Sequence, residues 1–521
     1  MHPVYIFKII VVVFSALTVS SCSITDTTVS KYVEDEKSLA KHYAAPDWFR
    51  DAKLGIYFTW GPYTVAAHAN EWYPRWMHFD FSDQDWVGRD KGYHIDAMPW
   101  HTKTFGHPSE FGYHDMIPRF TAERFDAAEW ADLFQRSGAR FAGPVAMHHD
   151  GYALWDSDIT PWNSADIGPK RDIMGELFAE LRKRDMKTVA TFHHARHLQR
   201  YKGQSKEEAM QRYGHLDSYH AYWNSHYPWI DGLPTTSEDP DLKLLYGNLP
   251  EEQWLEHFWL GTLKEVVDKY QPDIVWFDTW LDQIPQDTRY DFAAYYLNSA
   301  DRWGKEVMMT HKDQDMPKTF SVEDFEQGRR SKLTGLPWLT DDTISKWSWS
   351  YIEGLEVKPA EWVIHDFIDI VSKNGQLLLN VSPKYDGSIP DDQRAVLSAL
   401  GNWLEVNGEA IYGTRPWKIF GEGPTKMAEG GHFSKHVDYT SHDIRFTQSE
   451  DALYAISLGT PREPLHIVAL AKDNSIGVKT FTSVEALNGD YVESWSQKPD
   501  GLTIILKEDA PDQAAYAFRL N

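Results

Sequence analysis

Three apolar runs in this sequence end in side chains that can take part in chemistry. The runs and the polar residues that follow them are 141–147 before His148 and His149, 188–192 before His193 and His194, and 274–277 before Asp278. Clustered histidines beside an aspartate are able to ligate zinc. Neutral imidazoles also donate and accept hydrogen bonds, which suits the neighbouring hydroxyls of a sugar. An aspartate at a strand end serves as a reactive carboxylate or caps the next loop.

Helical patterns alternate with these runs. Asp126 and Glu129 predict the start of a helix because they form an N-terminal cap. Further elements with a clear period are helices within 173–181, 255–270 and 362–371, and a strand over 376–381. The alternation predicts a parallel sheet, and the length suits a (β/α)8-type barrel. Active sites of such barrels lie at the C-terminal strand ends, so we expect His148, His193 and Asp278 in one pocket.

The pattern changes after Trp417. Short strand-like runs separated by turn residues lie at 452–457, 465–471, 502–506 and 515–520. Strands at such spacing, without a helical period between them, predict a small antiparallel β-sandwich. We therefore expect a catalytic barrel over residues 45–413 and a C-terminal β-sandwich over residues 414–521.

The composition limits the classes of function. The 521 residues are enough for one large domain and one smaller domain. A formal charge of −25 argues against a nucleic-acid binder, because phosphates are met by a basic surface. The chain has 23 Trp, 26 Tyr and 25 Phe, whose flat rings either pack against the apolar face of a sugar or fill a large core.

The N-terminus resembles that of a bacterial lipoprotein. Lys8 precedes a short apolar run over 9–17, which is too short to span a bilayer. The sequence VSSC then ends at Cys22, the single cysteine of the chain. We expect a signal peptide over residues 1–22, lipidation of Cys22 and a polar tether over 23–44; the alternative is a plain signal peptide. An aspartate directly after the lipidated cysteine is the usual signal for retention in the inner membrane. Because Ser23 stands at this position, we predict an outer-membrane location.

Five motifs follow one another between residues 48 and 387. They are WFRDAKLG (48–55) with NEWY (70–73), FGY (111–113) with 120–126, GAR (138–140) through HHDG (148–151), PDIVWFD (272–278), and SKNG (372–375) through NVSP (380–383) and DG (386–387). Together they resemble glycoside hydrolase family 29, the α-L-fucosidases, over about residues 45–415. The resemblance implies a barrel with a trailing β-sandwich and a retaining exo-hydrolase of α-linked L-fucose that uses no cofactor.

The resemblance also implies residue roles. Asp278 of the WFD motif corresponds to the nucleophile, which a retaining glycosidase pairs with an acid about 5–5.5 Å away. His148 and His149 match a pair that binds fucose hydroxyls. Glu71 and Trp72 match a loop that accepts from hydroxyls and covers the apolar face of the sugar, although a surface loop is the alternative. Trp276 lines the pocket or belongs to the core. We predict that His148, His149, Glu71, Trp72 and Trp276 bind the substrate.

The acid/base residue is harder to place. The segment EDFEQGR over 323–329 lies where some family members carry D-x-E-x-G-R at the end of a later strand. We predict Glu326 as the acid/base, with Glu323 and Asp324 as alternatives. The stretch 338–342 offers another carboxylate.

One position departs from the family pattern. Many members have F-x-x-H-W-G, whereas Thr59 stands here at the place of that sugar-contacting histidine. Either another group supplies the contact, with His193, His194 and His68 as candidates, or the space admits a larger substituent such as a sulfate. We favour the first.

Other functions compete with a fucosidase. A catalytically silent fucose-binding lipoprotein would have no need of Asp278. A metal-dependent hydrolase would use the histidines and would lose activity to a chelator; we expect no metal. A third alternative keeps the mechanism and changes the sugar, for example to α-L-galactose. The expected partners are a fucosylated oligosaccharide or polysaccharide and, through the lipid anchor, a bacterial membrane.

Overall fold

The computed structural model describes residues 30–79, 96–200, 202–203, 225–427, 430–434, 436–472 and 475–521. Cys22 and the predicted signal peptide lie outside the described residues. Within these ranges, no helix is long and apolar enough to cross a membrane.

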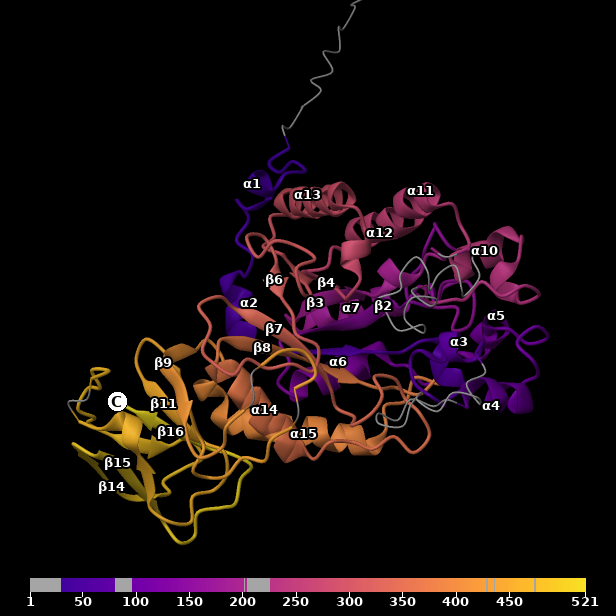
Figure 1. The fold of residues 1–521 in the computed structure, drawn as a ribbon. Helices are drawn as coiled ribbons and strands as arrows, with labels where there is room; N and C mark the ends of the chain where they lie inside the picture. The colour runs from indigo at the N-terminus through magenta and orange to yellow at the C-terminus, as the bar shows by residue number, and fades with distance from the viewer. Residues whose placement is uncertain are drawn as a thin grey trace, which may run out of the picture.

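Eight parallel strands form the larger part of the molecule (Figure 1). They are β1 (Leu54–Phe58), β2 (Phe141–Met147), β3 (Lys187–Phe192), β4 (Ile274–Phe277), β5 (Met308–His311), β6 (Val322–Glu323), β7 (Trp338–Thr343) and β8 (Gly375–Val381). Their order is β6-β5-β4-β3-β2-β1-β8-β7. A parallel bridge between Asp324 and Leu339 brings the end of β6 beside β7, so the sheet curls into a nearly closed barrel. The predicted barrel is confirmed.

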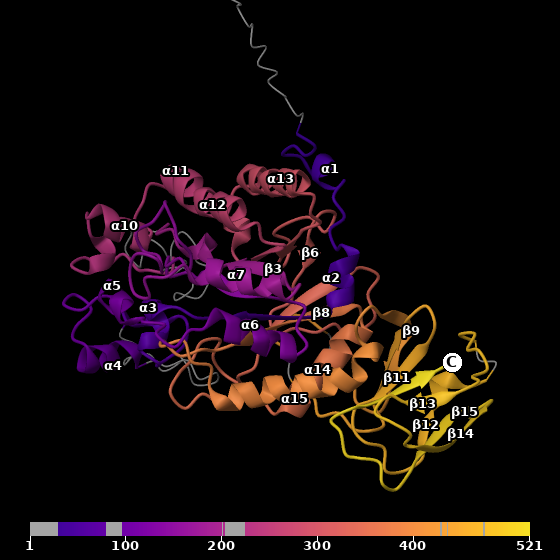
Figure 2. The ribbon, with the colours of Figure 1, turned by 180° about the vertical axis from the view of Figure 1, so that it is seen from behind.

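Helices cover the outside of this barrel (Figures 1 and 2). The longer ones are α6 (Ala127–Arg136), α7 (Ile173–Lys183), α12 (Leu260–Tyr270), α13 (Gln286–Trp303), α14 (Ala360–Ser372) and α15 (Asp391–Asn407). The shorter ones are α1 (Glu36–Leu39), α2 (Asp47–Ala52), α3 (Tyr73–Trp76), α4 (Ala97–Thr104), α5 (Tyr113–Met116), α10 (Pro240–Tyr246) and α11 (Glu251–Gln253). The predicted cap of α6 is present, because the Asp126 carboxylate accepts the N–H groups of Ala128 and Glu129.

The helix expected over 255–270 contains a wider turn. Residues Trp254–Trp259 form a π-helical segment that continues into α12. This segment buries Trp254, Phe258 and Trp259, and the Trp259 carbonyl lies 3.4 Å from Nε2 of His194. Such wide turns are uncommon and are not visible in the period of the apolar residues.

The C-terminal part is a β-sandwich, as predicted. One sheet has the order β13-β16-β11-β10-β9, the other β12-β15-β14, and all pairs are antiparallel. The strands are β9 (Arg415–Glu422), β10 (Ile444–Gln448), β11 (Leu453–Ser457), β12 (Leu465–Ile467), β13 (Val484–Ala486), β14 (Val492–Lys498), β15 (Gly501–Leu506) and β16 (Tyr516–Leu520). Phe446 and Phe518 from one sheet pack with Leu465 and Ile504 from the other.

One sandwich strand is shorter than expected. β12 ends at Ile467, and a 3₁₀ turn follows where the sequence pattern predicted a strand up to residue 471. The Glu422 carboxylate accepts the N–H groups of Val468 and Ala469 at 2.8 and 2.6 Å, so these groups bond to a side chain instead of a neighbouring strand. The boundary between residues 413 and 414 and the tether over 23–44 stay predictions.

The sandwich packs against α14 of the barrel (Figure 2). Asp369 on α14 is fully buried and accepts from Lys373, directly after this helix, at 2.6 Å and from Arg445 on β10 at 2.6 Å. Burial acts to raise the pKa of Asp369, but Arg445 and Lys373 outweigh it and hold the pKa below its ordinary value. A buried ion-pair network therefore joins the two parts.

Candidate active site

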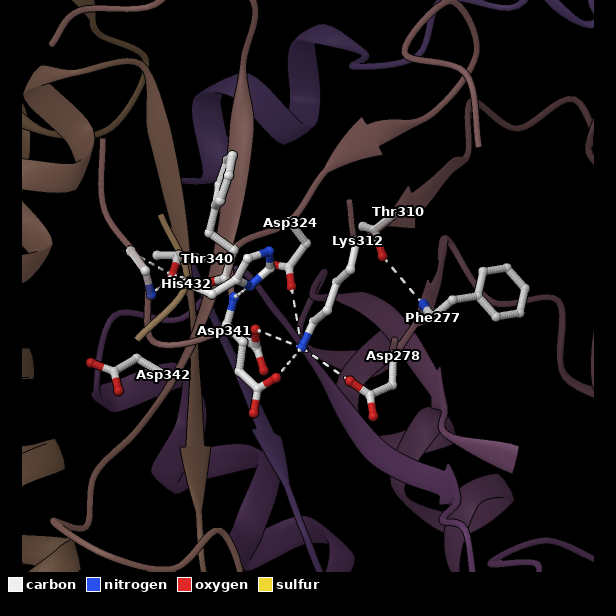
Figure 3. Close-up of polar contacts among 12 residues, drawn as sticks. Phe277, Asp278, Thr310, Lys312, Asp324, Thr340, Asp341, Asp342 and His432 are labelled. Atoms are coloured by element: carbon white, nitrogen blue, oxygen red, sulfur yellow. Dashed lines mark hydrogen bonds and ion pairs between the residues drawn. The ribbon is translucent and has the colours of Figure 1, made fainter. Parts of the chain in front are cut away.

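A lysine lies at the centre of four carboxylates at the C-terminal ends of neighbouring barrel strands. Nζ of Lys312, directly after β5, lies 3.0 Å from Oδ1 of Asp278, which follows β4, and 3.1 Å from Oε2 of Glu326. It also lies 3.4 Å from Oδ1 of Asp341 on β7 and 3.9 Å from Oδ2 of Asp324. Figure 3 shows the Lys312 nitrogen between the carboxyl groups of Asp278, Asp324 and Asp341. We call the five residues the carboxylate cluster.

Exposure divides the four acids into two kinds. The side chains of Asp278 and Glu326 are 12% and 19% exposed, whereas those of Asp324 and Asp341 are 0% and 3% exposed. Among the four acids, the first two have the most exposed surface from which to present an oxygen to a substrate. The other two lie beneath Lys312 and hold its ammonium group in place.

The two exposed acids differ in protonation. Burial acts to raise the pKa of Asp278, but the ammonium group of Lys312 outweighs it and holds the pKa well below its ordinary value. Burial raises the pKa of Glu326 to about 7, although Lys312 opposes this shift. Two carboxyl groups whose surroundings push their pKa values apart are suited to be a nucleophile and a general acid.

Protonation and a hydrogen bond reduce the negative charge of the two buried acids, Asp324 and Asp341. Burial, and after it the charge of Asp341, raise the pKa of Asp324 well above its ordinary value, which favours its protonated form. The Tyr57 hydroxyl donates to Oδ2 of Asp341 at 3.1 Å. The cluster therefore stabilises the lysine without leaving four full negative charges in one place.

Histidines form the wall beside Asp278. Nε2 of His149 lies 3.5 Å from Oδ2 of Asp278, and the ring of His148 lies 4.6 Å from that of His149 and 4.9 Å from that of His193. Trp72 covers this group, with its ring 4.8 Å from His149. Burial lowers the pKa of each of these three histidines, so their rings are neutral and able both to donate and to accept.

The same wall is extended by His226, whose ring lies 5.5 Å from both Trp72 and His149. Within the described ranges, no three or more His, Cys, Asp and Glu side chains are grouped so that they could hold a metal ion.

Sequence and structure comparisons place the chain among known proteins. A family model described as alpha-L-fucosidase matches residues 19–409. The chain belongs to the α-L-fucosidase family. It is 28% identical over 512 residues to the tissue alpha-L-fucosidase of Rattus norvegicus, covering 92% of this chain and 93% of the relative. The alpha-fucosidase of Thermotoga maritima in complex with fucose superposes with a TM-score of 0.66 at 26% identity, covering 93% of this chain and 99% of that one.

A second structure of the Thermotoga maritima alpha-fucosidase contains a mechanism-based inhibitor. It superposes with a TM-score of 0.67 at 26% identity, covering 94% of this chain and 100% of that one. The resemblance drawn from the five motifs is thus confirmed at the level of the family.

Two further residues predicted from the α-L-fucosidase motifs are Glu71 and Trp276. Glu71 is buried, accepts the N–H of Trp349 at 3.1 Å, and has its pKa raised to about 7 by burial. Trp276 on β4 is fully buried, and the Lys312 ammonium group lies 4.8 Å from its ring. Trp276 therefore supports the cluster from the core side.

Thr59, where many α-L-fucosidases carry a histidine, is buried at the end of β1 and its N–H donates to Oδ1 of Asn380 at 2.7 Å. Of the three candidates to supply the missing contact, only His193 lies beside the cluster, with its ring 5.1 Å from that of Trp276. His194 faces Thr262, and His68 stacks on a tryptophan 4.3 Å away.

The three candidates for the acid/base residue have different surroundings in the structure. Glu323, the last residue of β6, pairs with Lys318 at 2.6 Å and with Arg330 at 2.5 Å. Asp324 is fully buried. Among the predicted candidates in 323–326, Glu326 is the one that lies beside Lys312 with exposed surface.

Sequence reasoning missed Lys312 entirely. The available signal was the apolar run 307–309 shortly before His311 and Lys312, a strand-like stretch after a helical one. The stretch 338–342 was expected to offer a carboxylate, and Asp341 is the one that contacts Lys312.

Proposed function

We propose that this protein is a retaining exo-α-L-fucosidase in which Asp278 is the nucleophile and Glu326 is the acid/base. The contact that both residues make with Nζ of Lys312 supports this assignment, because two oxygens that touch one nitrogen lie no farther apart than the sum of the two distances, 3.0 and 3.1 Å. Retaining glycosidases separate their carboxyl groups by about 5–5.5 Å, and inverting enzymes need about 6.5–9.5 Å.

The reaction has two steps. The ionised Asp278 attacks the anomeric carbon of a terminal α-L-fucosyl unit while protonated Glu326 gives its proton to the departing glycosidic oxygen. A covalent fucosyl ester of Asp278 results. Glu326, now ionised, takes a proton from water, the water oxygen attacks the same carbon, and Asp278 is released together with α-L-fucose.

The wall around the cluster is suited to a sugar that carries several hydroxyls and one apolar face. His148 and His149 donate and accept, Glu71 accepts, and Trp72 offers a flat ring to C–H groups. The relative from Thermotoga maritima, which was solved with fucose, supports the choice of sugar. The expected substrate is a fucosylated oligosaccharide or polysaccharide.

The decisive experiment uses an aryl α-L-fucoside and the Asp278→Ala variant. Wild-type protein should release L-fucose, and NMR of the fresh product should show the α-anomer first. Asp278→Ala should retain its fold by circular dichroism and lose nearly all turnover, because the ester cannot form. First appearance of the β-anomer would refute retention, and full activity of Asp278→Ala would refute the nucleophile.

We also propose that Cys22 carries a lipid that holds the enzyme to a bacterial outer membrane. The support is the sequence VSSC after a short apolar run, with Ser23 rather than aspartate next. Cell fractionation should find the wild-type protein with outer membranes and the Cys22→Ala variant in the soluble fraction. A wholly soluble wild-type protein would contradict the anchor.

A further inference from the structure

The loop that carries Glu326 forms hydrogen bonds both with the barrel and with the C-terminal part of the chain. On the barrel side, the N–H of Phe325 donates to the Leu339 carbonyl at 3.1 Å, and the N–H of Gln327 donates to the Asp341 carbonyl at 2.7 Å. Both acceptors belong to β7. The main chain on either side of Glu326 is therefore fixed to the barrel.

The main chain of Glu326 itself bonds to the C-terminal part. Its N–H donates to Nδ1 of His432 at 3.0 Å, and its carbonyl accepts the N–H of Phe433 at 2.8 Å. Figure 3 shows His432 on the opposite side of the cluster from Asp278. We call residues 430–434, which lie in the connection between β9 and β10, the clamp segment.

Further contacts continue along this segment. Ser434 donates its N–H to the carbonyl of Gln327 at 2.9 Å, and its Oγ accepts the N–H of Arg329 at 3.2 Å. Gln327 has a φ of 43°, a conformation that residues with a Cβ seldom adopt. Its N–H is held by β7 and its carbonyl by the clamp segment, so two parts of the molecule together impose this turn directly after Glu326.

His432 also reaches the loop of the central lysine. A backbone N–H can only donate, so Nδ1 is the unprotonated nitrogen and Nε2 carries the hydrogen. Nε2 lies 3.3 Å from Oδ1 of Asp313, the residue next to Lys312. One imidazole ring thus joins the loop of Glu326 to the loop of Lys312.

We infer that His432 of the C-terminal sandwich is a positioning residue for the acid/base of the barrel. This inference rests on the proposed role of Glu326. A general acid must reach the departing oxygen at hydrogen-bond distance, and small misplacements of a catalytic group are costly. The acceptor at Nδ1 fixes the main chain at Glu326, so the sandwich takes part in the protonation step.

Two substitutions separate the functions of the two ring nitrogens. His432→Asn keeps an oxygen near the position of Nδ1, and His432→Gln keeps a polar group near the position of Nε2. Both are compared with wild type on a natural fucoside, which has a poor leaving group, and on an activated aryl α-L-fucoside. His466→Asn is the matched control, because His466 is a sandwich residue that contacts Thr503.

The expected result is that His432→Gln loses kcat on the natural fucoside by about tenfold, a part of the roughly 10²–10⁴-fold that general acid catalysis supplies. Its KM and its rate on the activated fucoside should change little, and His432→Asn should retain most of the activity on both substrates. Thermal unfolding of each variant reports on folding separately.

Two results would overturn the inference. One is equal activity of the Asn and Gln variants on the natural fucoside, and the other is an equal loss on both substrates, which would indicate a structural role. The Glu326→Ala variant separates this failure from that of the proposed function. If Glu326→Ala hydrolyses the natural fucoside like wild type, Glu326 is not the acid; if it fails while both His432 variants remain active, only the role of His432 is wrong.

Discussion

The ammonium group of Lys312 lies 3.0 Å from the carboxylate of Asp278, and its side chain is 1% exposed. A cation at this distance in a buried site favours the ionised carboxylate, which is the form that attacks a sugar. The same group contacts Glu326 at 3.1 Å and opposes the rise of its pKa. Lys312 therefore affects the pKa of both Asp278 and Glu326.

The first prediction concerns Lys312→Met. Without the cation, the pKa values of Asp278 and Glu326 should both rise, so both limbs of the kcat/KM profile should move to higher pH. We expect a loss of about 10²-fold in kcat/KM, because the two acids also lose a shared anchor. Lys318→Met is the control, since Lys318 pairs with Glu323 away from the cluster. An unshifted profile in Lys312→Met would disprove the electrostatic role.

The second prediction concerns the pH profile of the wild-type enzyme. Asp278 must be ionised to attack, so kcat/KM should fall only as pH drops through its depressed pKa. Glu326 must be protonated to act as an acid, so kcat/KM should fall as pH rises through about 7. The alkaline limb should be absent in Glu326→Gln.

The leaving group provides the matching test. Glu326→Gln should lose hydrolysis of a natural fucoside by roughly 10²–10⁴-fold and that of an activated aryl fucoside far less. Glu323→Gln, which alters a nearby carboxylate that pairs with Lys318 and Arg330, should behave like wild type on both. A Glu323→Gln variant with the larger loss would move the acid/base to that residue.

The sequence was sufficient for the barrel because its long strands and amphipathic helices repeat with clear periods. β2 and α6 are examples: the apolar run 141–147 and the cap at Asp126 appear where they were expected. The sequence also predicted that His148, His193 and Asp278 lie at one end of the barrel, because residues after parallel strands gather there, although the histidine that contacts Asp278 is His149.

Two residues of the site, Lys312 and His432, could not be predicted from the sequence. Lys312 follows a strand of four residues, which is too short to show a period, and no motif marks it. His432 lies 106 positions from Glu326, in another part of the molecule, and local patterns carry no information about such a contact. Both residues act through tertiary contacts that only the fold creates.

The third prediction concerns the stability of the junction between barrel and sandwich. Asp369→Ala leaves Lys373 and Arg445 buried without their carboxylate, which should cost about 3–5 kcal/mol of unfolding free energy. Denaturant unfolding followed by tryptophan fluorescence measures this cost. Asp512→Ala, which removes an exposed pair with Arg462, should cost about 0–1 kcal/mol. Similar costs for the two variants would contradict the importance of the buried network.

The last prediction compares His193 with His194. The two rings follow β3 and face different surroundings: His193 lies 4.9 Å from His148 beside the cluster, whereas Nε2 of His194 lies 3.2 Å from Oγ1 of Thr262 on α12. If His193 supplies the contact that Thr59 does not make, a sugar hydroxyl loses its partner in His193→Ala. The loss in kcat/KM on an aryl α-L-fucoside should then equal about 1–3 kcal/mol, with little change in stability.

His194→Ala should show the opposite pattern, because its ring is buried among aromatic side chains and its removal leaves a cavity. We expect a loss of about 2–5 kcal/mol of unfolding free energy and nearly normal kcat/KM below the unfolding temperature. Measuring kinetics and denaturant unfolding on both variants gives four values, and the crossed pattern is the expected one. If His193→Ala lowers stability and leaves kcat/KM unchanged, His193 is a core residue, and the contact absent at Thr59 must come from a different group.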